Sequence, residues 1–252
     1  MIRIFYIFLL FFGLTLFSEA ASRGDIKVIE ASENIRFLSQ KIVKDYLFFY
    51  KNQDKLEIKR GLDRSLDKLN GNFRIIAATT KDEDTKDILE FLAYSKDQIE
   101  QMFNEKADKE SAALMLDYSE TLLEGADSIA NTHMYDFSRE EKMLMLTKKI
   151  EYLLERVMKY YIAIHVGFNT PTNKEQMKKA ISSIEKSLVE ISLYEYPEEM
   201  KTVRKSLNDS WRENRLFFNK SDSLFIPKLM FISVTYMDEM IDQIALYHSK
   251  NQ

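Results

Sequence analysis

The chain has no cysteine and, among its 252 residues, only three prolines and six glycines. The absence of cysteine excludes a disulfide framework, a thiolate metal site and haem attachment through Cys-x-x-Cys-His. The scarcity of proline and glycine argues against a sheet-rich fold, because turns between strands normally need these residues. Leucine, lysine, glutamate, isoleucine and methionine are abundant instead. The composition therefore predicts an all-α protein.

An excess of one charge is also missing. The 36 basic and 40 acidic residues are interspersed and leave a net charge of −4. A nucleic-acid partner would require a basic face or stripe, so we expect no such partner. The sequence also has no Gly-rich phosphate loop, no nucleophile elbow and no His placed with a Ser or an acid at a recognisable spacing. These absences favour a protein that is not an enzyme.

Histidine is scarce too, with only His133, His165 and His248. A di-iron site in a four-helix bundle uses Glu-x-x-His motifs on facing helices. The residue three positions before each histidine is Ala or Ile, so this motif is absent. We therefore expect no metal and no cofactor, and we expect each histidine on the surface or at a helix end.

Residues 1–20 have the pattern of a secretory signal peptide. Arg3 supplies the positive start, and fourteen uncharged residues follow from Ile4 to Phe17. The small residues of Ser18-Glu19-Ala20 fit a cleavage site before Ala21. The apolar run is shorter than the about 20 residues of a membrane span. We therefore expect a soluble periplasmic protein after cleavage, with retention of this segment as a membrane anchor as the alternative.

Hydrophobic periodicity predicts eight helices after the signal peptide, in two sets of four. The expected segments are 25–51, 54–78, 83–105, 108–132, 138–168, 173–195, 197–218 and 222–249. Each set has the size of one four-helix bundle. We therefore expect residues 21–136 and 137–252 to form two tandem bundles, joined around His133 to Ser138. One elongated bundle with interleaved helices is the alternative.

Three of the expected helix starts have the pattern of a capping box. In this motif a cap hydroxyl and the carboxylate of a Glu three residues later satisfy each other's free backbone N–H groups. The pairs are Thr80 with Glu83, Ser138 with Glu141, and Thr172 with Glu175.

The two sets of helices also suggest a duplication. The run Leu38-Ser39-Gln40-Lys41-Ile42 lines up with Leu146-Thr147-Lys148-Lys149-Ile150. Further along, Lys44-Asp45-Tyr46 has an echo in Lys159-Tyr160-Tyr161, at a wider spacing. The difference implies about two extra turns in the first helix of the second set. In the register that pairs Leu38 with Leu146, Leu144 stands where Arg36 stands. A register two residues different places Lys142 at the position of Arg36 but loses the match of Ser39 with Thr147, so the second copy is degenerate in either register.

The most informative stretch lies in the first expected helix. An apolar stripe runs along it at helical spacing, formed by Ile35, Leu38, Ile42, Tyr46 and Phe49. Beside the stripe lie four polar residues: Arg36, Ser39, Gln40 and Lys41. A guanidinium beside an amide and a hydroxyl can bind a small planar anion, because its N–H donors match two oxygens at once. A solvated helix flank is the other interpretation of the same four residues.

The run Arg36-Phe37-Leu38-Ser39-Gln40-Lys41 resembles a family signature. It is similar to the arginine–methionine–leucine–serine–glutamine–arginine motif of the PilJ-type sensor domain of pilus chemotaxis transducers, which is related to the nitrate sensor of NarX-type kinases. Phe replaces Met here, and Lys replaces the last Arg. The resemblance implies a ligand-binding helical bundle in which the matching arginine faces a dimer seam and contacts the ligand.

On this basis we expect a non-enzymatic periplasmic sensor for a small anion such as nitrate or nitrite. Arg36, Ser39, Gln40 and Lys41 would be the ligand-binding residues, and two first helices would pair in a homodimer. The signal would pass to a membrane chemoreceptor or histidine kinase. Arg36→Ala would weaken binding and barely alter stability. The alternative function is a structural or interaction module of an envelope or pilus-associated assembly.

Overall fold

The computed structural model describes the backbone of residues 2–52, 56–221 and 223–251, and within these ranges the side chains from Arg23 onward except that of Leu56. The described residues form eight helices and no strand, which confirms the all-α prediction. The helices are α1 (Ile2–Lys51), α2 (Leu56–Thr79), α3 (Glu83–Asn104), α4 (Lys109–Thr132), α5 (Arg139–His165), α6 (Pro171–Ser192), α7 (Glu198–Asn219) and α8 (Pro227–Lys250).

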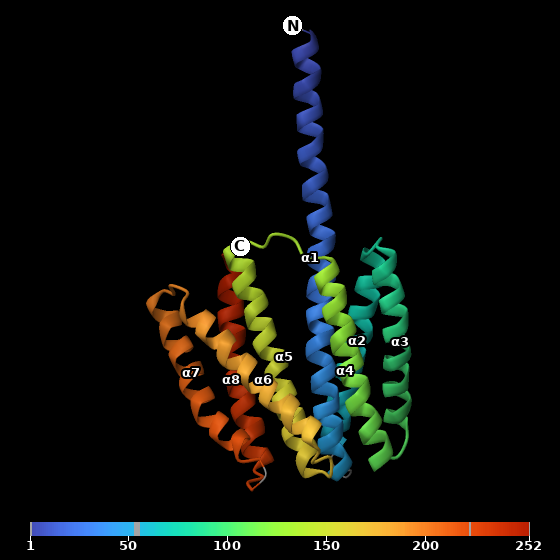
Figure 1. Cartoon of the computed structure of the whole chain (residues 1–252), viewed down its shortest axis with the longest axis vertical. Coiled ribbons are helices and arrows are strands. Elements are labelled where there is room, and N and C mark those ends of the chain that lie inside the picture. Colours follow the sequence, from blue (N-terminus) through green and yellow to red (C-terminus); the bar gives the residue numbers. More distant parts are fainter. Residues whose placement is uncertain (1, 53–55, 222, 252) are drawn as a thin grey trace.

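The helices pack as two four-helix bundles, α1–α4 and α5–α8, which lie side by side (Figure 1). Within the bundles, α1 packs mainly on α2 and α4, and α5 packs mainly on α6 and α8. The two bundles meet where α1 contacts α5, and this contact is nearly as extensive as the contact of α1 with α2 or α4. We call the α1–α5 contact, with the adjoining faces of α4 and α8, the seam.

The predicted apolar stripe lies in the core of the first bundle. Ile35, Leu38, Ile42 and Tyr46 are buried, and Phe49 is partly buried against the same core. Because three other helices cover α1, it also buries polar residues that lie outside the stripe. This central position of α1 determines the environment of the candidate site.

α1 begins at Ile2 instead of residue 25, and its first part extends beyond the two bundles (Figure 1). Proline is missing here, since the first proline of the chain is Pro171, so nothing interrupts the backbone hydrogen bonds of the helix. The predicted signal peptide, residues 1–20, lies outside the part of the chain whose side chains the structure describes. Among the described residues, no helix carries an apolar stretch long enough to span a membrane.

One predicted capping box is confirmed and two are wrong. Ser138 and Glu141 exchange both hydrogen bonds at the start of α5. At α3 the cap is Asp82, whose carboxylate accepts from the N–H of Thr85 at 2.7 Å, because Asp is as good a cap as Thr and lies next to the first turn. At α6 the cap is Thr170, because Pro171 fits the first helical position and starts the helix earlier than expected.

The two bundles repeat each other at a spacing of 115 residues. Both bounds of α7 lie 115 residues after those of α3, and α6 also begins 115 residues after α2. The ends of the bundles are tied in the same way. His133 Nδ1 lies 2.8 Å from Asp25 Oδ1 and His248 Nδ1 lies 2.6 Å from Glu140 Oε2, again 115 residues apart.

This spacing corrects the register of the duplication within the first helices. It pairs Lys44 with Lys159. It also excludes two extra turns in α5, because the segment from the carboxylate paired with histidine to the helix end has nearly the same length in α1 (25–51) and α5 (140–165). Thr147 therefore does not correspond to Ser39, although each hydroxyl donates to the carbonyl three residues before it. Such a bond is available to any helical Ser or Thr, so it carries no register information.

Each bundle is least tightly closed between its second and third helices. α2 and α3 make few contacts with each other, and so do α6 and α7. In contrast, α3 lies very close to α4 at Gly125, where an added Cβ would lie 2.5 Å from a methyl of the buried Leu92. In the first bundle the third helix is therefore held by the fourth, and a groove opens between α2 and α3.

Candidate functional site

Arg36 lies in the seam and is bound by groups from three helices. Its Nη1 donates to Glu33 Oε1 at 2.6 Å on the same helix, one turn away. Its Nη2 lies 3.2 Å from Asp127 Oδ1 of α4. The guanidinium also stacks on the ring of Tyr152 of α5, with 4.3 Å between its central carbon and the ring centroid. A cation over an aromatic face gains further stabilisation from the ring quadrupole.

The electrostatics around Arg36 do not favour an additional anion. Burial raises the pKa of Glu33, although Arg36 opposes that shift. Burial also disfavours the charged guanidinium, but Glu33, Tyr152 and Asp127 outweigh this effect and raise the pKa of Arg36. The two carboxylates lie on both terminal nitrogens of the guanidinium, and its Nε is buried without a hydrogen-bond partner. An anion would have to displace a carboxylate in order to bind here.

Ser39 and Gln40 are fully buried and serve the packing of α1 on α4. The hydroxyl of Ser39 donates to the carbonyl of Arg36 at 2.8 Å. The amide nitrogen of Gln40 donates to Ser39 Oγ at 3.0 Å and to the carbonyl of Ser119 at 3.2 Å. Both side chains therefore already have protein partners.

Lys41 lies apart from the other three predicted residues. It is one-third exposed, 3.3 Å from Asp45 Oδ2 and 4.0 Å from Glu155 Oε1. It lines a cavity of about 410 Å³ between α1 and α2, whereas Arg36 lines a different cavity of about 230 Å³. The structure thus brings Arg36, Ser39 and Gln40 together and separates them from Lys41.

An ion pair of the seam with both partners buried involves residues that the sequence did not single out as a site. Lys44 of α1 and Glu155 of α5 are almost completely buried, with 2.6 Å between Nζ and Oε2. Burial disfavours the charged lysine, but Asp45 and Glu155 outweigh this effect and raise the pKa of Lys44. Asp238 of α8 lies in the same cluster. Burial, and then Glu155, raise the pKa of Asp238 to about 8.

Lys159 of α5 is the counterpart of Lys44 and is completely buried. Its ammonium donates to Ser119 Oγ at 2.8 Å and to Glu120 Oε1 at 2.5 Å, both on α4. Arg156 holds the other oxygen of Glu120 at 2.6 Å. Burial lowers the pKa of Lys159 to about 8, and the positive charge of Arg156 adds to this shift, whereas Glu120 opposes it.

Each of the two buried lysines therefore forms an ion pair with a carboxylate of the other bundle. Lys44 reaches from the first bundle to a carboxylate of the second, and Lys159 reaches from the second bundle to the first. The only signal in the sequence was the recurrence of Lys44 at Lys159. Hydrophobic periodicity could not indicate their burial, because neither lysine belongs to an apolar stripe.

The histidines lie at helix ends, as predicted, but His248 is not on the surface. It is fully buried, with Nδ1 on Glu140 and Nε2 2.8 Å from the hydroxyl of Tyr196. Within the described ranges of the chain, no three His, Asp or Glu side chains gather in a way that could hold a metal ion.

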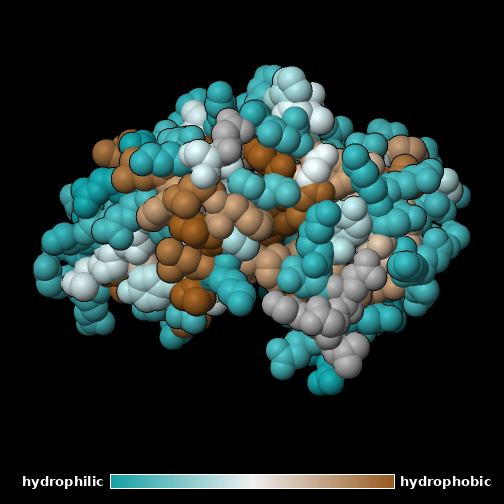
Figure 2. Space-filling model, turned by 90° about the horizontal axis from the view of Figure 1, so that it is seen from below, coloured by the Kyte–Doolittle hydropathy of each residue, from teal (hydrophilic) through white to brown (hydrophobic). Residues whose placement is uncertain are grey.

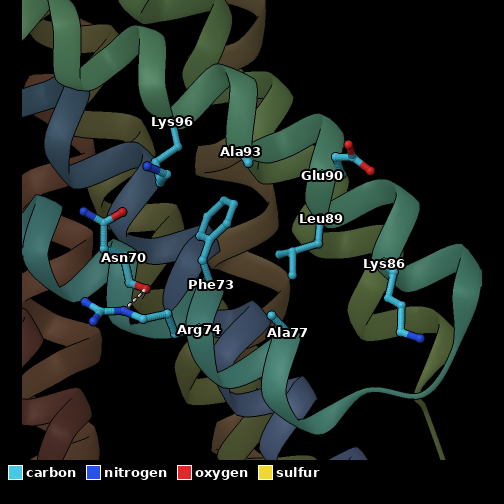
Figure 3. A pocket seen from close by; sticks show the side chains of 9 residues that line it. All are labelled: Asn70, Phe73, Arg74, Ala77, Lys86, Leu89, Glu90, Ala93 and Lys96. Atoms are coloured by element: carbon cyan, nitrogen blue, oxygen red, sulfur yellow. Dashed lines mark hydrogen bonds between the residues drawn. The ribbon is translucent and has the colours of Figure 1, made fainter.

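Two further cavities among the described residues form apolar grooves, one at the edge of the seam and one away from it. One lies at the end of the bundles opposite the N-terminus, where Figure 2 shows brown apolar side chains among teal polar ones. Its cavity of about 520 Å³ is lined by Asp45, Phe48, Glu57, Ile58, Gly61, Lys228, Phe231 and Ile232. The other, of about 580 Å³, lies between α2 and α3 and is shown in Figure 3.

Comparisons with known proteins assign no family to this arrangement: no family model, no curated protein and no solved structure matches the chain. The resemblance to PilJ-type and NarX-type sensor domains stays a prediction.

Proposed function

We propose that this protein is a non-enzymatic helical interaction module of the bacterial envelope, in which the seam is structural and the surface grooves dock a partner. The pairing of Arg36 with Glu33 and Asp127 carries this proposal. An anion receptor needs an arginine whose donors are available, and here carboxylates of the protein take the place of the ligand. The envelope location rests on the signal-peptide pattern of residues 1–20.

The expected homodimer would pair the first helices of two chains. The first helices of the two bundles already pair as α1 and α5, each covered on this side by the other. A buried ion pair is costly to break but contributes little net stability, and such groups are best known for fixing the register of packed helices. We assign this role to Lys44, Glu155 and Lys159.

A sensor of a small anion is the second candidate function. It is favoured by the cavity of about 230 Å³ beside Arg36, because Lys142 and Lys149 also line it. Nitrate or nitrite would then be the ligand, and a membrane chemoreceptor or histidine kinase would be the partner that receives the signal. This candidate depends on displacement of the half-exposed Asp127 from Arg36.

Calorimetric titration of nitrate and nitrite distinguishes the two functions. We expect no binding to the wild type at millimolar concentration. We also expect Arg36→Ala to lower the free energy of unfolding by about 2–4 kcal/mol, because it leaves the buried Glu33 without its partner. The expectation from the sequence, that this substitution barely alters stability, is thereby reversed.

Lys149→Ala is the matched control for this titration. It removes a cation of the same cavity without touching the Arg36 pairs, so its free energy of unfolding should stay within about 0.5 kcal/mol of the wild type. Saturable anion binding by the wild type that Arg36→Ala abolishes would instead establish the sensor.

A further inference from the structure

The groove between α2 and α3 has an apolar floor and a mostly cationic rim. Phe73 and Ala77 of α2 lie opposite Leu89 and Ala93 of α3, as Figure 3 shows. The remaining lining residues are Asn70, Arg74, Lys86, Glu90 and Lys96. Three of these are cations and one is an anion, and in Figure 3 the Glu90 carboxylate points away from the other side chains.

The second bundle shows what a closed version of this groove looks like. At the spacing of 115 residues, Arg204 and Asn208 occupy the positions of Leu89 and Ala93. Both reach across to α6: Arg204 Nη1 donates to the carbonyl of Ser192 at 2.9 Å, and Asn208 Nδ2 donates to its hydroxyl at 3.3 Å.

The two bundles also differ at a third position of this groove. The buried indole of Trp211 packs in the second bundle at the position that Lys96 occupies in the first. At the end of the groove the two bundles do agree, because Asn70 bonds Glu100 at 2.6 Å and Glu185 pairs with Arg215 at the equivalent positions. The helices are thus tied at the same point in both bundles, but in the second bundle Arg204 and Asn208 reach across the adjoining floor to Ser192.

We propose that the α2–α3 groove docks an amphipathic helix of a protein partner whose apolar stripe is flanked by acidic residues. This inference rests on the proposed interaction function and names the chemistry of the partner. The groove spans residues 70–77 of α2 and 86–96 of α3, which at 1.5 Å per residue is about 10–15 Å. That length matches two to three turns of a docked helix with apolar residues at i, i+3, i+4 and i+7.

The charges of the rim select the partner. Arg74 lies on one side of the floor, and Lys86 and Lys96 lie on the other. Lys86 pairs with Glu83 at 2.8 Å, and Lys96 pairs with Asp97 at 2.5 Å and more loosely with Glu100 at 3.4 Å. Glu83 and Asp97 are mostly exposed, so a partner's carboxylates can replace these two at little cost. The small side chains of Ala77 and Ala93 allow the partner's backbone to lie close to the floor.

A displayed library of 14-residue helical peptides tests the proposal. The library fixes Leu, Ile or Met at the four apolar positions and draws the other positions from Glu, Lys, Gln and Ser. We expect selection on the wild type to enrich Glu at the flanking positions. Enriched peptides should bind the closed variant Leu89→Arg/Ala93→Asn at least about tenfold more weakly by fluorescence anisotropy, because these residues cross the equivalent groove in the second bundle.

Two further variants keep the test independent of folding defects in the closed variant. Arg74→Glu/Lys86→Glu changes only rim residues that are substantially exposed, and it should reverse the preference of the enriched peptides from Glu to Lys. Arg204→Leu/Asn208→Ala removes the crossing side chains of the second bundle but leaves two of the three rim cations missing, because Val189 and Trp211 stand at the positions of Arg74 and Lys96. The stoichiometry should therefore stay at one peptide per chain.

Other outcomes overturn the proposal. Enrichment of Lys or of uncharged peptides, equal binding by the closed variant, or no enrichment would each exclude an acidic helix as the occupant. Binding of vesicles of anionic phospholipid that the closed variant abolishes, without any peptide binding, would assign the groove to lipid. None of these results would bear on an anion site at Arg36, which the titration with nitrate tests separately.

Discussion

Replacing Lys44 by alanine is expected to destabilise the protein by about 3–5 kcal/mol. The substitution leaves Glu155 buried without the ammonium that lies 2.6 Å from it, and Asp238 loses the same neighbour. The contact of the ammonium with the ring of Phe231, at 4.8 Å, is lost as well. Equilibrium unfolding in urea measures the change.

Lys41 provides the matched control for Lys44. It lies one turn earlier on α1, is one-third exposed and is 4.0 Å from the same carboxylate group. Lys41→Ala should therefore cost no more than about 1 kcal/mol. The double variant Lys44→Met/Glu155→Leu should recover most of the loss, because it removes both buried charges and keeps the volume. Equal costs for the two lysines would show that the seam is not held by buried charge.

Asp238 is expected to make stability depend on pH between about 5 and 8. Its pKa in the folded protein is raised to about 8, first by burial and then by Glu155, whereas an unfolded aspartate titrates near 3.8. Between these values the folded state holds a proton that the unfolded state has released. The stabilisation is thus present at low pH and is lost as pH rises toward 8, by up to about 1.4 kcal/mol per pH unit.

The groups that face Asp238 define the control. They are Glu155 and Glu151 on α5 and Lys44 and Lys41 on α1. Asp238→Asn keeps the shape but cannot ionise, so its free energy of unfolding should fall less steeply with pH than that of the wild type. At pH 8 the variant should be the more stable protein. Parallel pH profiles of the two proteins would place the titrating group elsewhere.

The fold could be read from the sequence because its signals are local. Few breakers and a repeating apolar stripe predict helices, and the observed bounds from α2 onward lie within a few residues of the expected ones. The exact helix starts depend on competition between neighbouring cap residues. Thr172 and Glu175 have the right spacing, yet Pro171 starts the helix first, because a fixed backbone angle at N1 is a stronger signal than a possible side-chain bond.

The seam could not be read in the same way, because it depends on which helices meet. The motif around Arg36 predicted an available guanidinium. Whether Glu33 and Asp127 reach it depends on the packing of α1 against α4, which no local pattern specifies. The burial of Lys44 and Lys159 likewise follows from the central position of α1 and α5. Their recurrence at equivalent positions was visible in the sequence, but its meaning required the contact between the bundles.

We expect the buried ion pairs across the seam to join the two bundles into one cooperative unit. Unfolding of the wild type in urea, followed by two signals, tests it most directly. Trp211 is the only tryptophan, so its fluorescence reports on the second bundle alone, whereas far-ultraviolet circular dichroism reports on both. Such cooperativity predicts a single transition with the same midpoint for both signals. A circular dichroism transition in two steps, of which the fluorescence follows only one, would contradict it.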